Sequence, residues 1–321
     1  MQVSGQSAKD NRQMLDGRWD KNDSKDSANI ADLVSQGKCQ FYDVPDQRIV
    51  ELRNLLSLRK RLKRDEHRLR IRIRNTLVCK YFPELDQYMD SCHQENLAII
   101  RWCLDPRQIS AMTLNEFVKM ITRTTRGQRQ FERLIRIQEA AGRSIGCKVD
   151  DSTRFEARML AGRLEVLQTQ IQETMEQIQK IAEQTDYYDQ LLTIPGFAPY
   201  IAALVISVIG NPFRFANHKK LLRIAGLDLS ASRSGKTSDT AVPVISKRGN
   251  ADLRYGLYQA ALVATYKNNA FVQLFTRCLK CRERERGIKT RMRVKIGAKM
   301  LVIAWSMMKS GQEFNSKLLE A

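Results

Sequence analysis

The feature that most constrains the fold is a long amphipathic run over residues 151–188. Along it, apolar side chains and one threonine recur at alternating steps of four and three residues: Leu160, Leu164, Leu167, Ile171, Thr174, Ile178 and Ile181. This heptad period is typical of a helix that packs along another helix. Neither glycine nor proline interrupts the run after Gly162. The pattern predicts one long helix, which either pairs two subunits as a coiled coil or forms a long hairpin with another helix.

A second helical run covers residues 46–78, and its polar face is almost entirely basic. Leucine and isoleucine recur at roughly helical spacing, while arginine and lysine occupy most of the opposite face. A solvated helix face usually mixes both signs of charge, so this face predicts contact with a nucleic-acid backbone. The expected contact residues are Arg59, Lys60, Arg61, Lys63, Arg64 and Arg68.

The charge balance also indicates a polyanionic partner. The chain has 54 Lys and Arg against 35 Asp and Glu, a formal net charge of +19. Its most apolar stretch, residues 201–209, is much shorter than the roughly 18 residues of a membrane span. The first residues lack the apolar core of a signal peptide, and the seven cysteines show no disulfide spacing. We therefore expect a nucleic-acid partner, no membrane, and a cytoplasmic, nucleoid-associated location.

A hydroxyl-rich loop is predicted between two apolar helical runs, over residues 226–254. Glycines in it permit positive φ angles and a close approach of the backbone to a ligand. Cations and backbone N–H groups can hold a phosphodiester, and one hydroxyl could attack it. A solvent-exposed Ser/Thr loop is the alternative interpretation. The hydroxyl residues are Ser230, Ser232, Ser234, Thr237, Ser238, Thr240 and Ser246, and the cations are Arg233, Lys236, Lys247, Arg248 and Arg254.

Two further patterns carry possible functions. Asp23 and Asp26 are three residues apart and share a helix face, where two carboxylates can hold Mg²⁺; acids that complement a helix dipole are the alternative. Residues 191–210 resemble a helix-hairpin-helix with its tight turn at residues 195–199, in which backbone amides near Gly196 contact DNA phosphates. Ala198 stands where a second glycine is usual, and an ordinary core hairpin is the alternative.

Together these segments resemble transposases of the IS110 family of bacterial insertion sequences, which are related to the Piv-type invertases. In the C-terminal part the resemblance rests on IPGFAPYIAALVISVIGNPFRF, AGLDLSASRSGK, ISKRGNADLRYGLYQAAL and RVKIGAKMLVIAW, in this order. Upstream, KNDSKDSANIADLVSQG resembles the end of the family's RuvC-like domain. FYDVPDQRIVELRNLLSLRKRLKRDEHRLRIRIRNTL resembles the basic helix that follows that domain.

The resemblance implies roles for particular residues. The family's RuvC-like domain binds divalent metal through four acids, of which Asp23 and Asp26 match the third and fourth. The first two precede this point in the family, so the resemblance indicates an N-terminally shortened copy, with Mg²⁺ expected only when the domain is complete. A serine nucleophile is implied within Ser232-Arg233-Ser234-Gly235, and we choose Ser234 with Ser232 in reserve. The neighbouring cations would neutralise developing charge: Arg233, Lys236, Lys247, Arg248 and Arg254.

We therefore expect a mainly α protein in four parts. These are a RuvC-like remnant (1–44), a basic helical region (45–150), a coiled-coil helix (151–190) and a C-terminal transposase domain with a helix-hairpin-helix-like unit (191–321). The function implied is DNA transposition with a structured guide RNA, in a homo-oligomer joined by the coiled coil. The alternatives are an inactive remnant that only binds DNA, RNA or a full-length transposase, and a helix-hairpin-helix repair or nucleoid protein.

Overall fold

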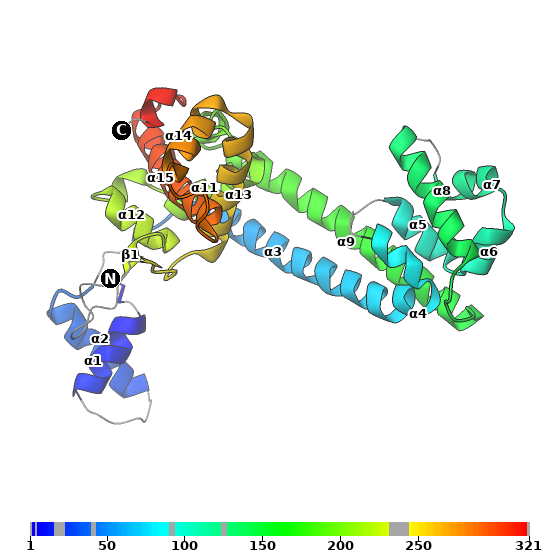
Figure 1. Ribbon diagram of the computed structural model, residues 1–321. Helices are drawn as coiled ribbons and strands as arrows, with labels where there is room; N and C mark the ends of the chain where they lie inside the picture. Colours follow the sequence, from blue (N-terminus) through cyan, green and yellow to red (C-terminus); the bar gives the residue numbers. More distant parts are fainter. Residues whose placement is uncertain are drawn as a thin grey trace.

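Two long antiparallel helices, α3 (Gln47–Ile73) and α9 (Asp151–Glu183), form the spine of the computed structural model (Figure 1). The structure describes residues 2–3, 5–15, 23–39, 43–89, 94–122, 127–230 and 244–319. Ion-pair and hydrogen-bond contacts fix the antiparallel register, since Arg48 bonds the Gln184 carbonyl and Arg72 pairs with Glu156. At ~1.5 Å per residue, α9 is about 50 Å long, so it links two separate bodies.

The heptad positions of α9 pack against other helices of the same chain. Leu160, Leu164, Ile171, Thr174 and Ile178 are all buried, each less than 9% exposed. Their face packs along α3, where the leucines and isoleucines of the basic helix supply the opposite surface. The structure thus shows the long-hairpin arrangement. Because α3 occupies this face in the structure, self-association of the chain stays a prediction.

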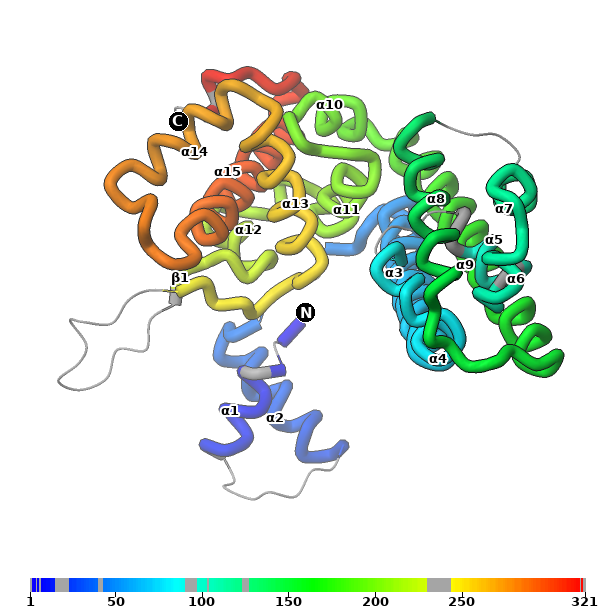
Figure 2. The backbone as a smooth tube through the Cα atoms, turned by 45° about the vertical axis from the view of Figure 1, so that its right-hand side comes forward, coloured from blue at the N-terminus to red at the C-terminus, as the bar shows by residue number. Residues whose placement is uncertain are grey.

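The distal body surrounds the end of the hairpin farthest from the C-terminus (Figure 2). Its apolar core includes Phe82, Leu85, Ile100, Phe117 and Leu134, all fully buried. Side-chain caps begin two of its short helices, Asp105 for α6 and Thr113 for α7. The elements are η1 (Arg74–Val78), α4 (Cys79–Tyr81), η2 (Pro83–Tyr88), α5 (Gln94–Cys103), α6 (Pro106–Ala111), α7 (Leu114–Ile121) and α8 (Gln128–Gly142).

The C-terminal body is built around α11 (Pro199–Ile209), which is apolar on every side. Residues 201–207 are all buried because α3, α9, α13 and α15 pack around this helix. No helix within the described residues is long and apolar enough to cross a membrane. The other elements are α10 (Tyr188–Leu192), η3 (Pro212–Arg214), α12 (His218–Ala225), α13 (Ala251–Lys267), α14 (Asn269–Leu279), α15 (Ile288–Ser310) and η5 (Ser316–Leu319).

A small helical hairpin, α1 (Gly5–Leu15) and α2 (Asp23–Ser35), stands beside the C-terminal body (Figure 1). Buried polar groups join its two helices: Asn11 donates to the side chains of Asn29 and Asp32 at 2.8 Å. Asn29 in turn donates to the Ala8 carbonyl at 2.6 Å. Strand occurs in the described residues as the two-residue strands β1 (Leu229–Ser230) and β2 (Val244–Ile245), which pair antiparallel. The expectation of a mainly α fold is confirmed.

Candidate nucleic-acid interface and loop stem

The ends of the hydroxyl-rich loop are joined in a stem between α12 and α13. β1 pairs with β2, with Leu229 opposite Ile245 and Ser230 opposite Val244. Below the strands, Ser246 donates its backbone N–H to the Asp228 carbonyl at 2.8 Å and its hydroxyl to the Asp228 carboxylate at 2.5 Å. The stem therefore holds Ser230 and Val244, the residues that flank 231–243, side by side. The predicted site residues Ser232, Arg233, Ser234 and Lys236 lie in that segment, outside the described residues.

Backbone geometry fixes the stem tightly. Gly226 ends α12 at φ +65°, and a Cβ there would lie 2.8 Å from the Arg254 guanidinium and from the Lys247 carbonyl carbon. Lys247 itself has φ +56°, a conformation that costs a non-glycine residue on the order of 1–3 kcal/mol. Its N–H donates to the Gly226 carbonyl at 3.0 Å, and this hydrogen bond helps to maintain the strained backbone.

The three predicted cations at the C-terminal end of the stem have different environments. Lys247 and Arg248 are exposed, so their charges face solvent beside the two ends of the loop. Arg254 is half-buried and donates to the Ala225 carbonyl at 2.8 Å, where it caps the C-terminal end of α12. The geometry thus favours Lys247 and Arg248 as ligand contacts and gives Arg254 a structural role.

The basic face of α3 meets the start of α13 beside this stem. A groove of about 420 Å³ lies between α3, α11 and α13, and Lys60, Tyr200 and Asn250 line it. Lys60 pairs with Asp252 at 2.7 Å, and the Arg59 guanidinium stacks 4.2 Å from the Tyr200 ring centroid. Burial raises the pKa of Tyr200 above its usual value. Asn250 directly follows the stem, so the groove connects α3 to the loop's base.

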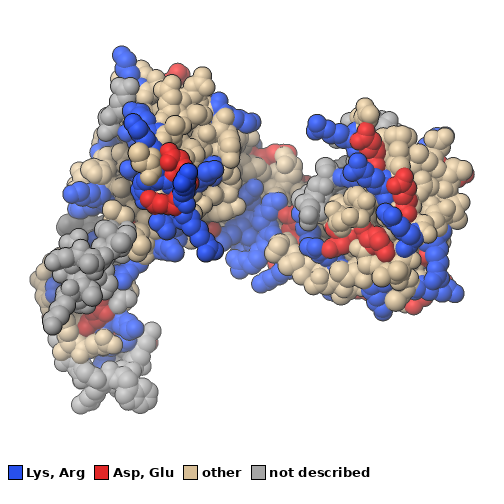
Figure 3. Space-filling view, viewed as in Figure 1, with Lys and Arg blue, Asp and Glu red and all other residues tan. Residues whose placement is uncertain are grey.

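Charges on α3 are partly compensated farther along the helix. Glu66 is 5% exposed, and it accepts from Lys63 at 2.9 Å and from Arg70 at 2.8 Å. Burial opposes the charged form of Glu66, but these cations outweigh burial and lower its pKa. Arg68 lies 3.5 Å from Asp65. Arg61 and Arg64 are exposed, and lysine and arginine gather over α3 between the two bodies (Figure 3).

The helix-hairpin-helix-like turn packs into the C-terminal body. Gly196 has φ +89°, and a Cβ on it would overlap the Ala260 carbonyl oxygen of α13 and lie 3.2 Å from the Ala264 nitrogen. Close packing of the turn against α13 therefore explains the glycine. A contact between Gly196 and a DNA phosphate stays a prediction.

Asp23 and Asp26 occupy the first turn of α2, as acids at a helix N-terminus commonly do. Asp26 is already paired with Arg12 at 3.1 Å. The described residues contain no group of three or more His, Cys, Asp or Glu side chains placed to hold a metal ion. Two carboxylates, one of them ion-paired, do not fit a divalent-metal site by themselves.

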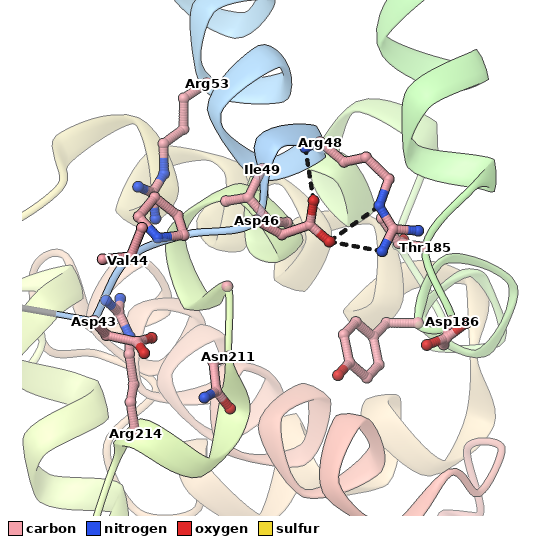
Figure 4. A pocket seen from close by; sticks show the side chains of 13 residues that line it. Asp43, Val44, Asp46, Arg48, Ile49, Arg53, Thr185, Asp186, Asn211 and Arg214 are labelled. Atoms are coloured by element: carbon pink, nitrogen blue, oxygen red, sulfur yellow. Dashed lines mark hydrogen bonds and ion pairs between the residues drawn. The ribbon is translucent and has the colours of Figure 1, made fainter.

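A polar pocket of about 220 Å³ lies where the α3–α9 hairpin joins the C-terminal body (Figure 4). Three arginines fix this junction: Arg48 bonds Asp46 and the Gln184 carbonyl, Arg53 donates to the Ser207 carbonyl, and Arg214 donates to the Val208 carbonyl. Burial and then the charge of Arg53 lower the pKa of Arg214. This junction cannot be predicted from the sequence. Each arginine bonds a backbone carbonyl, which any residue type provides, and the carbonyls of Gln184 and Ser207 are far along the chain from Arg48 and Arg53.

Two family models match the chain, one at each end of the sequence. The model of the transposase IS116/IS110/IS902 family matches residues 188–276, from α10 into α14. A second transposase model, that of the DEDD transposases of IS110 elements, matches residues 2–83, from before α1 to the start of η2. No curated protein matches the chain.

These matches define a transposase, a class of protein that acts on DNA. The chain belongs to the IS110 family of transposases, as the sequence resemblance indicates. Membership implies DNA transposition and DNA as the partner, and DEDD transposases generally use a divalent metal.

Proposed function

We propose that the chain takes part in DNA transposition through Ser234, whose hydroxyl attacks a DNA phosphodiester, with Ser232 as the reserve nucleophile. The observation that carries this proposal is the stem: it pairs Ser230 with Val244, which flank residues 231–243, and it presents the exposed cations Lys247 and Arg248. The loop also lies within the segment matched by the IS116/IS110/IS902 transposase family.

The proposed step exchanges one phosphodiester for another. The serine oxygen forms a bond to phosphorus and gives up its proton, and a bond from phosphorus to a deoxyribose oxygen breaks. The leaving oxygen takes the electron pair of the broken bond and then a proton. One strand end is thereby joined to the protein as a phosphoserine diester. No oxidant or nucleotide cofactor is required, because the number of phosphoester bonds is unchanged.

Cations around the loop would stabilise the charge that develops on the phosphate oxygens. Lys247 and Arg248 contribute from the stem, and Arg233 and Lys236 from the loop. Arg254 contributes indirectly, since it supports the stem through the Ala225 carbonyl.

Mg²⁺ is the expected metal, but the pair Asp23 and Asp26 does not fit it alone. We propose that these two carboxylates bind Mg²⁺ only together with further carboxylates supplied by another polypeptide or segment. When bound, the metal would supply Lewis-acid stabilisation of the phosphate. The step above is assigned to the serine and its cations.

The exposed basic residues of α3 are the proposed contact for DNA or a structured guide RNA. Arg61 and Arg64 face solvent, and Arg59 and Lys60 border the groove that leads to the loop stem. Sequence choice would then come from base pairing, while the protein contacts backbone phosphates.

Self-association is also proposed, through a surface other than the heptad face. Phe155, Met159 and Val166 lie along α9 and are 55–60% exposed. Their spacing of four and seven residues places them on one side of the helix. An exposed apolar line of this kind is typical of a protein contact, and it offers a dimer contact that leaves the α3–α9 hairpin intact.

A second function, nucleic-acid binding without catalysis, is favoured by one observation: the described acids do not form a metal site. An adduct assay separates the two functions. The full chain is mixed with labelled donor DNA, Mg²⁺, and a helper IS110 transposase that has all four acids but lacks its own serine. A covalent protein–DNA adduct on this chain, lost in Ser234→Ala and kept in Ser232→Ala, supports catalysis. Binding without any adduct supports the second function.

A further inference from the structure

Helix α13 presents an apolar and aromatic face to solvent. Tyr255 and Tyr266 are 66% and 72% exposed, and Val263 is 42% exposed. The opposite side of the helix, which includes Leu257 and Ala260, is fully buried. A helix at a protein surface normally carries polar residues on its outer side. An outer face of tyrosines therefore indicates a ligand or partner.

The two tyrosines lie on one line along the helix. Tyr255, Gln259, Leu262 and Tyr266 follow one another in steps of four, three and four residues, which keeps them on a single stripe. Eleven residues at ~1.5 Å each separate the tyrosines by about 16 Å. This stripe, from Tyr255 to Tyr266, is here called the tyrosine face.

Cations stand at both ends of the tyrosine face. The Arg293 guanidinium lies 5.2 Å from the centroid of the Tyr266 ring and 5.0 Å from that of Phe275, and Lys267 follows Tyr266 directly. At the other end, α13 begins four residues before Tyr255, just after the exposed stem residues Lys247 and Arg248. Rings that can stack on bases, with cations at both ends that can contact phosphates, suit a single strand of nucleic acid.

We propose that the tyrosine face binds an unpaired DNA strand, whose bases stack on Tyr255 and Tyr266 while Arg293 and Lys267 contact its phosphates. The proposal rests on the proposed function. A strand held at the loop stem is DNA, and α13 leads directly away from that stem. Unpaired bases are required because paired bases expose only their edges in the grooves, whereas stacking on a side chain needs a free π face.

The test measures binding of the full chain to fluorescent oligonucleotides by anisotropy, over a salt series. The probes are single-stranded DNA, RNA of the same sequence, and the DNA duplex. The double variant Tyr255→Ala/Tyr266→Ala is expected to lose single-stranded DNA affinity by about ten-fold per tyrosine. Duplex affinity should change less than two-fold. The slope of log affinity against log salt should stay the same, since no charge is removed.

Two control variants separate stacking from other effects. Tyr255→Phe/Tyr266→Phe keeps the rings and is expected to bind single-stranded DNA as the unaltered chain does. Trp102→Ala removes a matched exposed ring from the distal body, 59% exposed and 5.4 Å from the Arg101 guanidinium. It is expected to leave binding unchanged.

Three results would overturn the inference. If the double alanine variant binds single-stranded DNA normally and keeps the steep salt slope, the face does not stack bases, while the proposed function stands. If the tyrosines matter for RNA and not for DNA, the assignment to a DNA strand is wrong. If the variant loses only self-association, measured by sedimentation, the face is a protein interface. Absence of salt-sensitive binding by the unaltered chain would instead refute the proposed function.

Discussion

Replacing Gly196 with alanine should destabilise the C-terminal body strongly. The added Cβ would overlap the Ala260 carbonyl oxygen and lie 3.0 Å from the Ala260 carbonyl carbon. Both atoms belong to the backbone of α13, so neither can move without displacing the helix. Overpacking of this kind costs about 1–3 kcal/mol, and φ +89° is a region where a non-glycine residue pays a further ~1–3 kcal/mol. We expect a loss of about 2–6 kcal/mol in the free energy of unfolding.

Gly162→Ala provides a control with the same chemical change. Gly162 lies inside α9, and a Cβ there meets nothing within 4 Å. Because alanine favours helix by roughly 0.5–1 kcal/mol over glycine, this variant should be slightly more stable. Urea unfolding followed by fluorescence of Trp305, in a background with Trp19 and Trp102 changed to phenylalanine, reports on the C-terminal body. If Gly196→Ala and Gly162→Ala unfold at the same urea concentration, the packing explanation of Gly196 is refuted. A contact between this turn and DNA would then be the remaining explanation of the glycine.

Three other outcomes are expected. Nucleic-acid affinity should fall steeply with salt, and Arg61→Ala/Arg64→Ala should reduce the log–log slope by about 2; an unchanged slope would exclude α3 from the contact. Asp150 caps α9 and has its pKa lowered to about 2 by hydrogen bonds from the Thr153 N–H and the Ser152 hydroxyl. Its contribution to stability is therefore present above about pH 4 and is lost as pH falls towards 2. Asp150→Ala should lower the melting temperature at pH 7, and the difference should vanish near pH 2; a constant difference would contradict the assignment. Phe155→Ala/Val166→Ala should weaken self-association in sedimentation, and an unaltered mass distribution would place that contact elsewhere.

The two long helices could be predicted from the sequence because each repeats a period over many turns. The run at residues 151–188 indicated α9 (Asp151–Glu183), and residues 46–78 indicated α3 with its π-helical end. The heptad period indicates that α9 packs along another helix, but it does not distinguish a helix of the same chain from a helix of a second subunit. A period is local, whereas the choice between α3 and a second subunit depends on the three-dimensional path of residues 79–150.

The candidate site was predictable only in part. The resemblance located the serine loop. Which of its cations are free to contact a ligand and which have a structural role depends on backbone carbonyls, such as that of Ala225, which accepts from Arg254. The tyrosine face was not predicted, because three tyrosines in an apolar helix look like core residues until burial shows which side faces solvent. A core hairpin was one of the two interpretations of the turn at Gly196, but its packing partner could not be predicted, since Ala260 lies 64 positions farther along the sequence.

The most direct test of the central claim is the identity of the residue that becomes bonded to DNA. The adduct formed with the helper transposase is digested with nuclease and protease, and the nucleotide-bearing residue is located by tandem mass spectrometry. The proposed function predicts a phosphodiester on Ser234, inside the segment closed by the β1–β2 stem. A nucleotide on Ser232 would select the reserve nucleophile. A nucleotide on a residue outside 231–243, or none on this chain, would contradict the account.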